Sequence, residues 1–318
     1  MWLLLAFCSA ALLGCYDVCK KQALRNNAVV PVLTLNTLFC TLIFMPCVVA
    51  SRMGMFDVGH LLYVPHCSLR EHAFIVLKAV IVLSSWLCGY LGIKHLPLTI
   101  VGPINATRPV MVLVGALLVF GEHLNLYQWM GVTLAVVSFF MLSRSGRREG
   151  IDFRHNRWIA LVVLAAALGA VSGLYDKHIM APVGEGGVGL NRMAVQSYYN
   201  AYQFVLMAAV MLVMRRVQAR RVRQAAAQGA PLPAATAFRW HWAIPLISVF
   251  LSVADFAYFY ALSLPGALIS VVSMVRRSSV LVSFTVGAII FHEKNLRAKA
   301  FDLFLVMLGM LFLYLGSR

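Results

Sequence analysis

The residues best suited to chemistry in this chain are charged side chains inside long apolar segments. Arg276 and Arg277 lie near the middle of the apolar segment 266–291, and Arg108 and Asp255 lie near the middle of two others. If such a segment crosses a bilayer, one charge at its centre costs ~2.5–3.5 kcal/mol. Arginine cannot avoid this cost by losing its proton, because its pKa exceeds ~12. The sequence therefore predicts a site that requires these charges.

The chemistry that these charges favour is capture of an anion. Three arginines and one aspartate leave an excess of positive charge at depth, and a guanidinium binds a carboxylate or phosphate through two parallel hydrogen bonds. We therefore expect Arg276, Arg277 and Arg108 to line a cavity for a small anionic or zwitterionic molecule. In the alternative, one arginine pairs with Asp255 and the others bind backbone carbonyls. Adjacent helical residues point about 100° apart, so Arg276 and Arg277 cannot both face one spot squarely.

Proline residues surround Arg108. Pro103 and Pro109 each remove a backbone donor and disrupt a helix locally, which would free carbonyl groups at membrane depth. Those carbonyls, with Asn105, either line the site or are satisfied by Arg108 in a kink that only shapes packing.

Asp255 belongs to a polar helix face with Ser248, Ser252 and either Tyr258 or Phe259, at a spacing of three to four residues. Asp255 is either the counter-ion of an arginine or a protonatable group that couples transport to an ion.

Further candidates are aromatic or hydroxyl side chains. Ser273 and Tyr258 are expected to contact the substrate; Trp86 either forms a cavity wall or packs between helices. The run Gln196-Ser-Tyr-Tyr-Asn-Ala-Tyr-Gln203 either lines the cavity mouth or anchors a helix at the interface.

The composition excludes an ordinary soluble protein, since 61% of the 318 residues are hydrophobic and 12% are charged, against roughly 25% charged in globular chains. The net charge of +16 lies mainly in short connections between apolar segments, which favours contact with a lipid bilayer and not with nucleic acid. The seven cysteines and nine histidines show no disulfide or metal-ligand spacing, and no cofactor motif is present. We predict no metal and no cofactor.

Ten apolar segments are long enough to cross a bilayer, which needs ~20 residues each. An all-α integral membrane protein is expected, with spans at 2–24, 29–51, 72–94, 97–120, 124–143, 157–180, 194–216, 240–263, 266–291 and 298–317. The basic, Ala- and Gln-rich stretch 217–239 is predicted to be a mobile loop.

The chain also repeats itself. Gly14-Cys-Tyr16-Asp17 is echoed by Gly173-Leu-Tyr175-Asp176, and these Tyr-Asp pairs are expected to serve gating or structure. We divide the chain into a first five-helix repeat at 1–143, a connecting loop at 144–156 and a second repeat at 157–318. Because five spans reverse direction, the two repeats would be inverted, with the substrate site between them near the midplane.

The connections differ in charge between the two sides of the predicted bundle. One side, which includes the loops 25–28, 144–156 and 217–239, carries 18 of the 27 Lys and Arg residues, whereas the side with both termini carries five. The positive-inside rule therefore predicts that both termini lie outside.

The segment Arg108-Pro-Val-Met-Val-Leu-Val-Gly-Ala-Leu-Leu-Val-Phe-Gly-Glu-His-Leu, continued by Gln128-Trp-Met-Gly131, resembles the EamA-like family of the drug/metabolite transporter superfamily. The second half keeps the aromatic residue and Glu293 of this pattern. Members of the family commonly place both termini in the cytoplasm. Val275-Arg-Arg-Ser-Ser is similar to the basic pair in the ninth helix of phosphate and sugar-phosphate translocators, in which the pair grips phosphate.

This resemblance implies a non-enzymatic, multi-pass secondary transporter of the cytoplasmic membrane, which moves a small-molecule substrate by alternating access. A homodimer is compatible with it. Two other functions stay open: a lipid-linked sugar flippase, and an intramembrane transferase that holds a lipid phosphate.

Overall fold

The computed structural model describes most of the chain: residues 2–108, 110–111, 125–147, 155–180, 183–228, 236–263, 275–276, 278–290 and 296–316. Within these residues the secondary structure is helical, as the sequence predicts. The helices are α1 Trp2–Leu24, α2 Val29–Arg52, α3 Leu69–His95, α4 Leu98–Ala106, α6 Leu126–Arg147, α7 Arg157–Met180, α8 Arg192–Ala227, α9 Ala243–Ser263, α11 Ser279–Ile290 and α12 Leu296–Gly316, with a short 3-10 turn Val183–Glu185.

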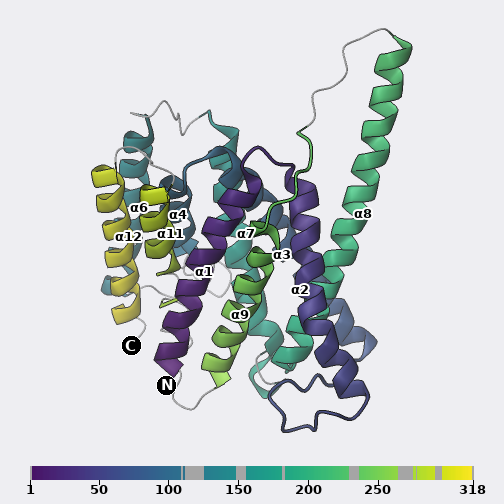
Figure 1. The fold of residues 1–318 in the computed structure, drawn as a ribbon. Helices are drawn as coiled ribbons and strands as arrows, with labels where there is room; N and C mark the ends of the chain where they lie inside the picture. Colours follow the sequence, from purple (N-terminus) through teal and green to yellow (C-terminus); the bar gives the residue numbers. More distant parts are fainter. Residues whose placement is uncertain are drawn as a thin grey trace.

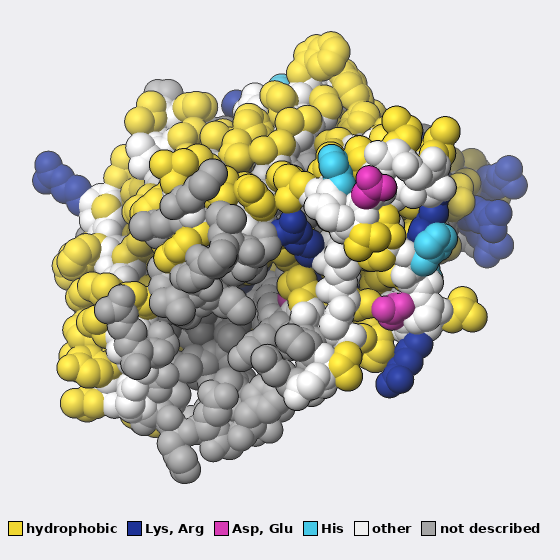
Figure 2. Space-filling view, turned by 90° about the horizontal axis from the view of Figure 1, so that it is seen from below, with side chains coloured by type: hydrophobic (Ala, Val, Ile, Leu, Met, Phe, Trp, Pro, Cys, Tyr) yellow, Lys and Arg dark blue, Asp and Glu magenta, His cyan; other side chains and the backbone are white. Residues whose placement is uncertain are grey.

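Six of the described helices are long and apolar enough to cross a membrane, namely α2, α3, α7, α8, α9 and α12. Figure 2 shows the bundle from the end where both termini lie, and hydrophobic side chains form most of its outer rim. Leu42, Leu164 and Phe304 are examples of large apolar residues left exposed on α2, α7 and α12. Exposed apolar surface on this scale suits contact with lipid acyl chains.

The main helix pairs join the two halves of the chain (Figure 1). Helix α1 packs along α9 and α7 packs along α3, while α2 meets α8, α4 meets α11 and α6 meets α12. Exchanging the halves turns the α1–α9 pair into the α7–α3 pair and leaves the other three pairs unchanged. Each half therefore completes the core of the other.

Side chains cap the starts of helices α3 and α8. Ser68 and Glu71 form a capping box at α3: the Glu71 N–H donates to the Ser68 hydroxyl, and the Ser68 N–H donates to the Glu71 carboxylate at 2.6 Å. These bonds favour the ionised carboxylate and hold the pKa of Glu71 below its usual value. At α8, the Asn191 side chain accepts from the Met193 N–H.

The two glycines of the repeated Gly-x-Tyr-Asp element lie in different surroundings. A Cβ added to Gly14 in α1 would lie 2.4 Å from the Cβ of Val282 in α11, whereas a Cβ on Gly173 in α7 would meet nothing within 4 Å. Glycine at position 14 therefore allows α1 and α11 to approach closely.

We expect Gly14→Ala to lower the free energy of unfolding by about 1–3 kcal/mol, because the added methyl group overpacks the α1–α11 contact. Gly173→Ala is the matched control and should change stability by less than about 1 kcal/mol, in the stabilising direction, through helix propensity. Unfolding of the purified variants in detergent measures both. Equal effects of the two substitutions would contradict the close packing of α1 on α11.

Helix α4 ends earlier than the predicted span 97–120 would allow. Its last residue is Ala106, three residues before Pro109, and the Thr107 hydroxyl donates to the Ile104 carbonyl at 2.7 Å. Proline lacks an N–H and so cannot continue the hydrogen-bond ladder of α4 through position 109. The break is a turn at Thr107, and helical structure resumes at Arg108, where the Met111 N–H donates to the Thr107 carbonyl at 3.2 Å.

The predicted span 266–291 is also interrupted in its described part. A turn at Ser278, whose N–H donates to the Val275 carbonyl at 3.0 Å, separates Arg276 from the start of α11 at Ser279. The prediction placed Arg276 inside one continuous helix. Ser278 also donates its hydroxyl to the Val275 carbonyl at 2.6 Å, and such local bonds compete with the helix ladder.

Helix α8 corrects the first part of the predicted mobile loop 217–239, because it stays helical as far as Ala227. Arginine, glutamine and alanine are all strong helix formers, so a basic, Ala-rich stretch continues a helix readily. At ~1.5 Å per residue its 36 residues extend over roughly 54 Å, more than the ~30 Å of a hydrocarbon core. Figure 1 shows α8 projecting well past the other helices, at the end opposite both termini.

Candidate functional site

The guanidinium of Arg276 donates a hydrogen bond to the carboxylate of Asp255 in α9, and the two residues form an ion pair. The guanidinium carbon of Arg276 also lies 4.2 Å from the ring centroid of Tyr258, which is a cation–π distance. Both charged side chains are mostly buried, with 20% and 12% of their surface exposed. The structure thus places Arg276, Asp255 and Tyr258 together and gives Arg276 a carboxylate partner.

Tyr199 in α8 joins this ion pair to a second one. Its hydroxyl donates to the other oxygen of Asp255 at 3.4 Å, and its ring centroid lies 5.0 Å from the ammonium nitrogen of Lys78 in α3. Lys78 in turn pairs with Asp176 of α7. A continuous polar network therefore crosses the bundle interior through α3, α7, α8 and α9, with residues from both halves.

A third ion pair lies on α1. The Lys20 ammonium contacts the Asp17 carboxylate at 2.7 Å, three residues away, and lies 4.1 Å from the Tyr16 ring centroid and 5.3 Å from that of Tyr90. The equivalent aspartate of the second half, Asp176, instead reaches across to α3.

Tyr175, next to Asp176, donates its hydroxyl to the Phe74 carbonyl at 3.1 Å. This bond ties α7 to α3. It gives Tyr175 a structural contact, whereas its aspartate neighbour takes part in the charged network.

Arg108 has a different environment from the other cations of the network. Its guanidinium donates to the Asn105 side-chain oxygen at 3.2 Å, and its Nε is buried without a hydrogen-bond partner. It packs on α7 at Gly169, where an added Cβ would lie 2.8 Å from the guanidinium carbon. A buried donor without a partner costs about 1–3 kcal/mol.

The charge balance of the network is therefore uneven. Lys20, Lys78 and Arg276 each contact a carboxylate, whereas Arg108 contacts an uncharged amide among the described residues. The charges within the three ion pairs cancel, so among the described residues of the network the positive charge of Arg108 remains. Arg277 and Ser273, which the sequence also proposed, lie outside the described residues, as do Glu122 and Glu293 of the repeated end segments.

Trp86 does not contact these charged groups through any described interaction. It is partly buried and packs against the main hydrophobic cluster, which draws residues from α1, α2, α3, α4, α7, α8 and α9. Its position agrees with the alternative of helix packing.

Sequence reasoning missed Lys78, named Tyr199 only as part of the run 196–203, and did not match Arg108 with Arg276. Each of these arginines follows the proline of a Leu-Pro pair by eleven residues, with Pro97 in the first half and Pro265 in the second. Tyr90 and Tyr258 precede the same prolines by seven residues. Aligning the halves on these pairs would have matched the two arginines. Lys78 is a single charged residue in an apolar segment, and the sequence does not indicate that Asp176 is its partner.

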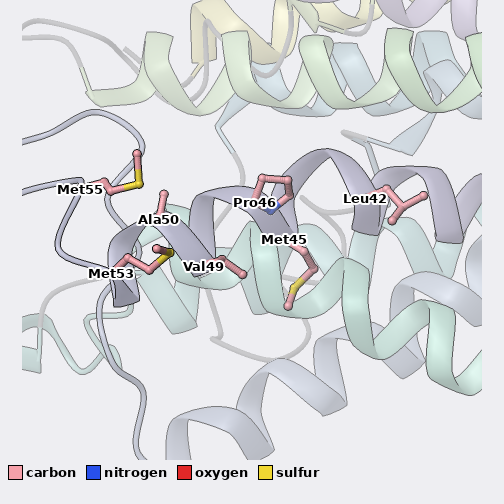
Figure 3. A pocket seen from close by; sticks show the side chains of 7 residues that line it. All are labelled: Leu42, Met45, Pro46, Val49, Ala50, Met53 and Met55. Carbon is pink, nitrogen blue, oxygen red and sulfur yellow. The ribbon is translucent and has the colours of Figure 1, made fainter.

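A groove elsewhere on the surface can be set aside as an anion site. It follows the end of α2 around Pro46 and encloses about 420 Å³ (Figure 3). All its lining residues are apolar: Leu42, Met45, Pro46, Val49, Ala50, Met53 and Met55. It offers no charged or hydrogen-bonding side chain. The described residues also contain no group of three His, Cys, Asp or Glu side chains that could hold a metal ion.

Comparison with known proteins gives a family for the first part of the chain. Residues 1–144 match the EamA-like transporter family, as the resemblance predicted. No curated protein matches the sequence. A solved crystal structure, described only as that of a protein, is 13% identical, covers 100% of this chain and 98% of its own, and superposes with a TM-score of 0.58. At this identity the likeness shows a shared fold and nothing about the substrate.

Proposed function

We propose that this chain, whose residues 1–144 match the EamA-like transporter family, is a secondary active transporter that moves a small anionic or zwitterionic metabolite across the cytoplasmic membrane. The observation that carries the proposal is Arg108, a cation in the bundle interior with no carboxylate contact among the described residues. The match of residues 1–144 supports a multi-pass membrane transporter. The substrate class rests on the charge of Arg108.

An anion would complete the network at Arg108. A substrate carboxylate or phosphate would accept hydrogen bonds from the guanidinium, including the Nε that has no partner. Arg276, and by its position in the chain Arg277, would meet the same ligand once the Asp255 pair opens. A zwitterion would place its ammonium group against the released carboxylate of Asp255. The Tyr258 ring and Asn105 already lie against the two arginines, which supports them as substrate contacts.

The pairing of helices across the halves supports ten spans arranged as two inverted five-helix repeats, at 1–143 and 157–318. Helices α1 and α9, and by symmetry α7 and α3, would then be the elements that move against each other. The ion pairs of Asp17 and Asp176, with Tyr16 and Tyr175 beside them, lie on α1 and α7 and would act as gates or as structural ties. Asp255 would serve as counter-ion in the substrate-free state.

A thermal-shift screen of the purified protein tests the substrate class. Carboxylates, phosphate monoesters and amino acids should raise the unfolding temperature, while amines of matched size should not. A ligand at 100 times its Kd stabilises the folded state by about 2.7 kcal/mol. Stabilisation by amines alone would contradict the proposal.

Uptake of the hits into sealed proteoliposomes tests transport. We expect accumulation that is lost when the vesicles are permeabilised and that does not require ATP. Chemical conversion of the solute in detergent solution, with no compartment present, would instead indicate an enzyme.

A further inference from the structure

The inward face of α8 carries polar side chains that the charged network does not use. Gln196, Tyr199, Asn200 and Gln203 recur at helical spacing and are all buried, Gln203 completely. Of these, only Tyr199 belongs to the charged network. The others form an uncharged polar stripe on either side of it.

Several atoms of this stripe have no hydrogen-bond partner among the residues that the structure describes. Both the amide nitrogen and the amide oxygen of Gln203 are unpaired, as are the amide nitrogen of Gln196 and the hydroxyl of Ser197. Buried polar groups in proteins are nearly always paired, and the interior of a membrane protein has little water to pair them. Apolar side chains of the same size would pack here at lower cost.

The neighbouring helices add unpaired groups to the same region. The Ser252 hydroxyl in α9 and the Asn36 amide nitrogen in α2 are buried without partners. Ser252 lies one turn from Asp255, to which Tyr199 bonds. Asn36 accepts a 2.8 Å bond from Ser248, one turn further along α9.

A hydrogen bond also fixes α2 against the stripe, because Thr41 donates to the Asn200 carbonyl at 3.0 Å. Contacts therefore link the polar faces of α2, α8 and α9 to one another and to the Asp255 carboxylate. We call Asn36, Gln196, Ser197, Gln203 and Ser252 the amide–hydroxyl group.

We propose that the amide–hydroxyl group binds the uncharged part of the transported anion, by hydrogen bonds to hydroxyl or carbonyl groups. A carboxamide supplies two donors and one acceptor, and a serine hydroxyl does both, so the group matches a ligand with several hydroxyl groups and does not match an alkyl chain. The inference rests on the proposed function, since Arg108 would hold the charged end. It adds that the substrate is a hydroxylated or carbonyl-bearing organic anion, not an inorganic or fatty one.

Two carboxylates of equal chain length test the proposal: gluconate, which is hydroxylated along its chain, and hexanoate, which is not. Their affinities for the full-length protein are measured by thermal shift and by competition in proteoliposome uptake. We expect wild-type protein to bind gluconate at least ~10-fold more tightly, because a site that hydrogen-bonds a ligand leaves its polar groups unpaired against an apolar analogue.

Gln203→Met replaces the amide by an apolar side chain of similar size. It should remove most of the preference for gluconate and leave the hexanoate affinity within ~2-fold, because the paired amide bonds are lost and the arginine is not. Without ligand, its unfolding temperature should equal or exceed that of wild type, since an unpaired buried amide has been removed. Gln218→Met, on the exposed part of α8, is the matched control and should change nothing.

The outcomes distinguish a failure of this proposal from a failure of the proposed transport function. Equal binding of gluconate and hexanoate, or a Gln203→Met protein that keeps the preference, overturns the proposal alone. A Gln203→Met protein with a lower unfolding temperature and an unchanged preference would show that the amide pairs with ordered water or protein, and also overturns it. The proposed function is overturned as well if neither anion binds the wild-type protein. It is also overturned if Arg108→Gln binds the anions as tightly as the wild type.

Discussion

Arg108→Gln is expected to weaken binding of an anionic substrate by roughly 10- to 100-fold, because a hydrogen bond to a charged group contributes about 1.5–3 kcal/mol and each 1.4 kcal/mol is a factor of ten. Glutamine keeps a donor amide and removes the charge. Arg108 has no described carboxylate partner, so its replacement leaves no described acid unpaired. The variant should therefore fold as stably as the wild type while losing affinity.

Concentration-dependent uptake into proteoliposomes measures this loss, and unfolding in detergent checks the fold. Arg108→Lys keeps the charge and loses the forked geometry, so it should fall between the two proteins. Arg223→Gln, on the exposed extension of α8, is the matched control for removing one arginine. If Arg108→Gln transports anions with unchanged affinity, the site lies elsewhere.

Asp255→Ala is expected to destabilise the protein by about 3–5 kcal/mol, because it leaves the guanidinium of Arg276 buried without its carboxylate. The Tyr199 hydroxyl loses its acceptor in the same variant. This effect should appear in the purified protein without any substrate, as a lower midpoint of denaturant or thermal unfolding.

A double-mutant cycle separates the two roles open to Asp255. If it is a counter-ion, replacing Asp255 and Arg276 together by leucine should recover most of the stability, since an apolar pair often substitutes well for a buried ion pair. If it is a protonatable coupling group instead, the single variant should keep its stability and lose the dependence of transport on a proton gradient. Additive destabilisation in the cycle would rule out the ion pair as a stabilising contact.

The sequence predicts where the helices of this protein begin and end better than it predicts which side chains pair between helices. Apolar length alone located α2, α3, α7 and α9 to within a few residues, because a membrane span must be helical. It also placed Asp255 on the short list of partners for Arg276. It could not pair Lys78 with Asp176, since that contact depends on the rotation of α3 against α7. Helices that are apolar on all sides carry little signal for that rotation.

The corrections to the prediction have local causes. Hydropathy ended the span of α8 at its first arginines, although arginine favours helix as strongly as leucine. The break before Ser279 was missed because a single serine changes the hydropathy of an apolar segment little. The Ser278 hydroxyl nevertheless competes with backbone N–H groups for a carbonyl. Arg108 and Arg276 lie one and two residues from the turns at Thr107 and Ser278, so the positions that hydropathy treats as span centres lie beside helix breaks in the fold.

The pairing of helices between the halves also determines when this protein can assemble. Helix α9, the main partner of α1, follows it by more than two hundred residues, so at ~5–20 residues per second α1 waits roughly 10–50 s for it during synthesis. Lys78 likewise enters the membrane before Asp176 has been made. During that interval Gly14 of α1 and the charged side chain of Lys78, which are packed against the second half in the finished fold, are exposed to lipid or to the insertion machinery. The first half therefore completes its packing only after the second half has been synthesised.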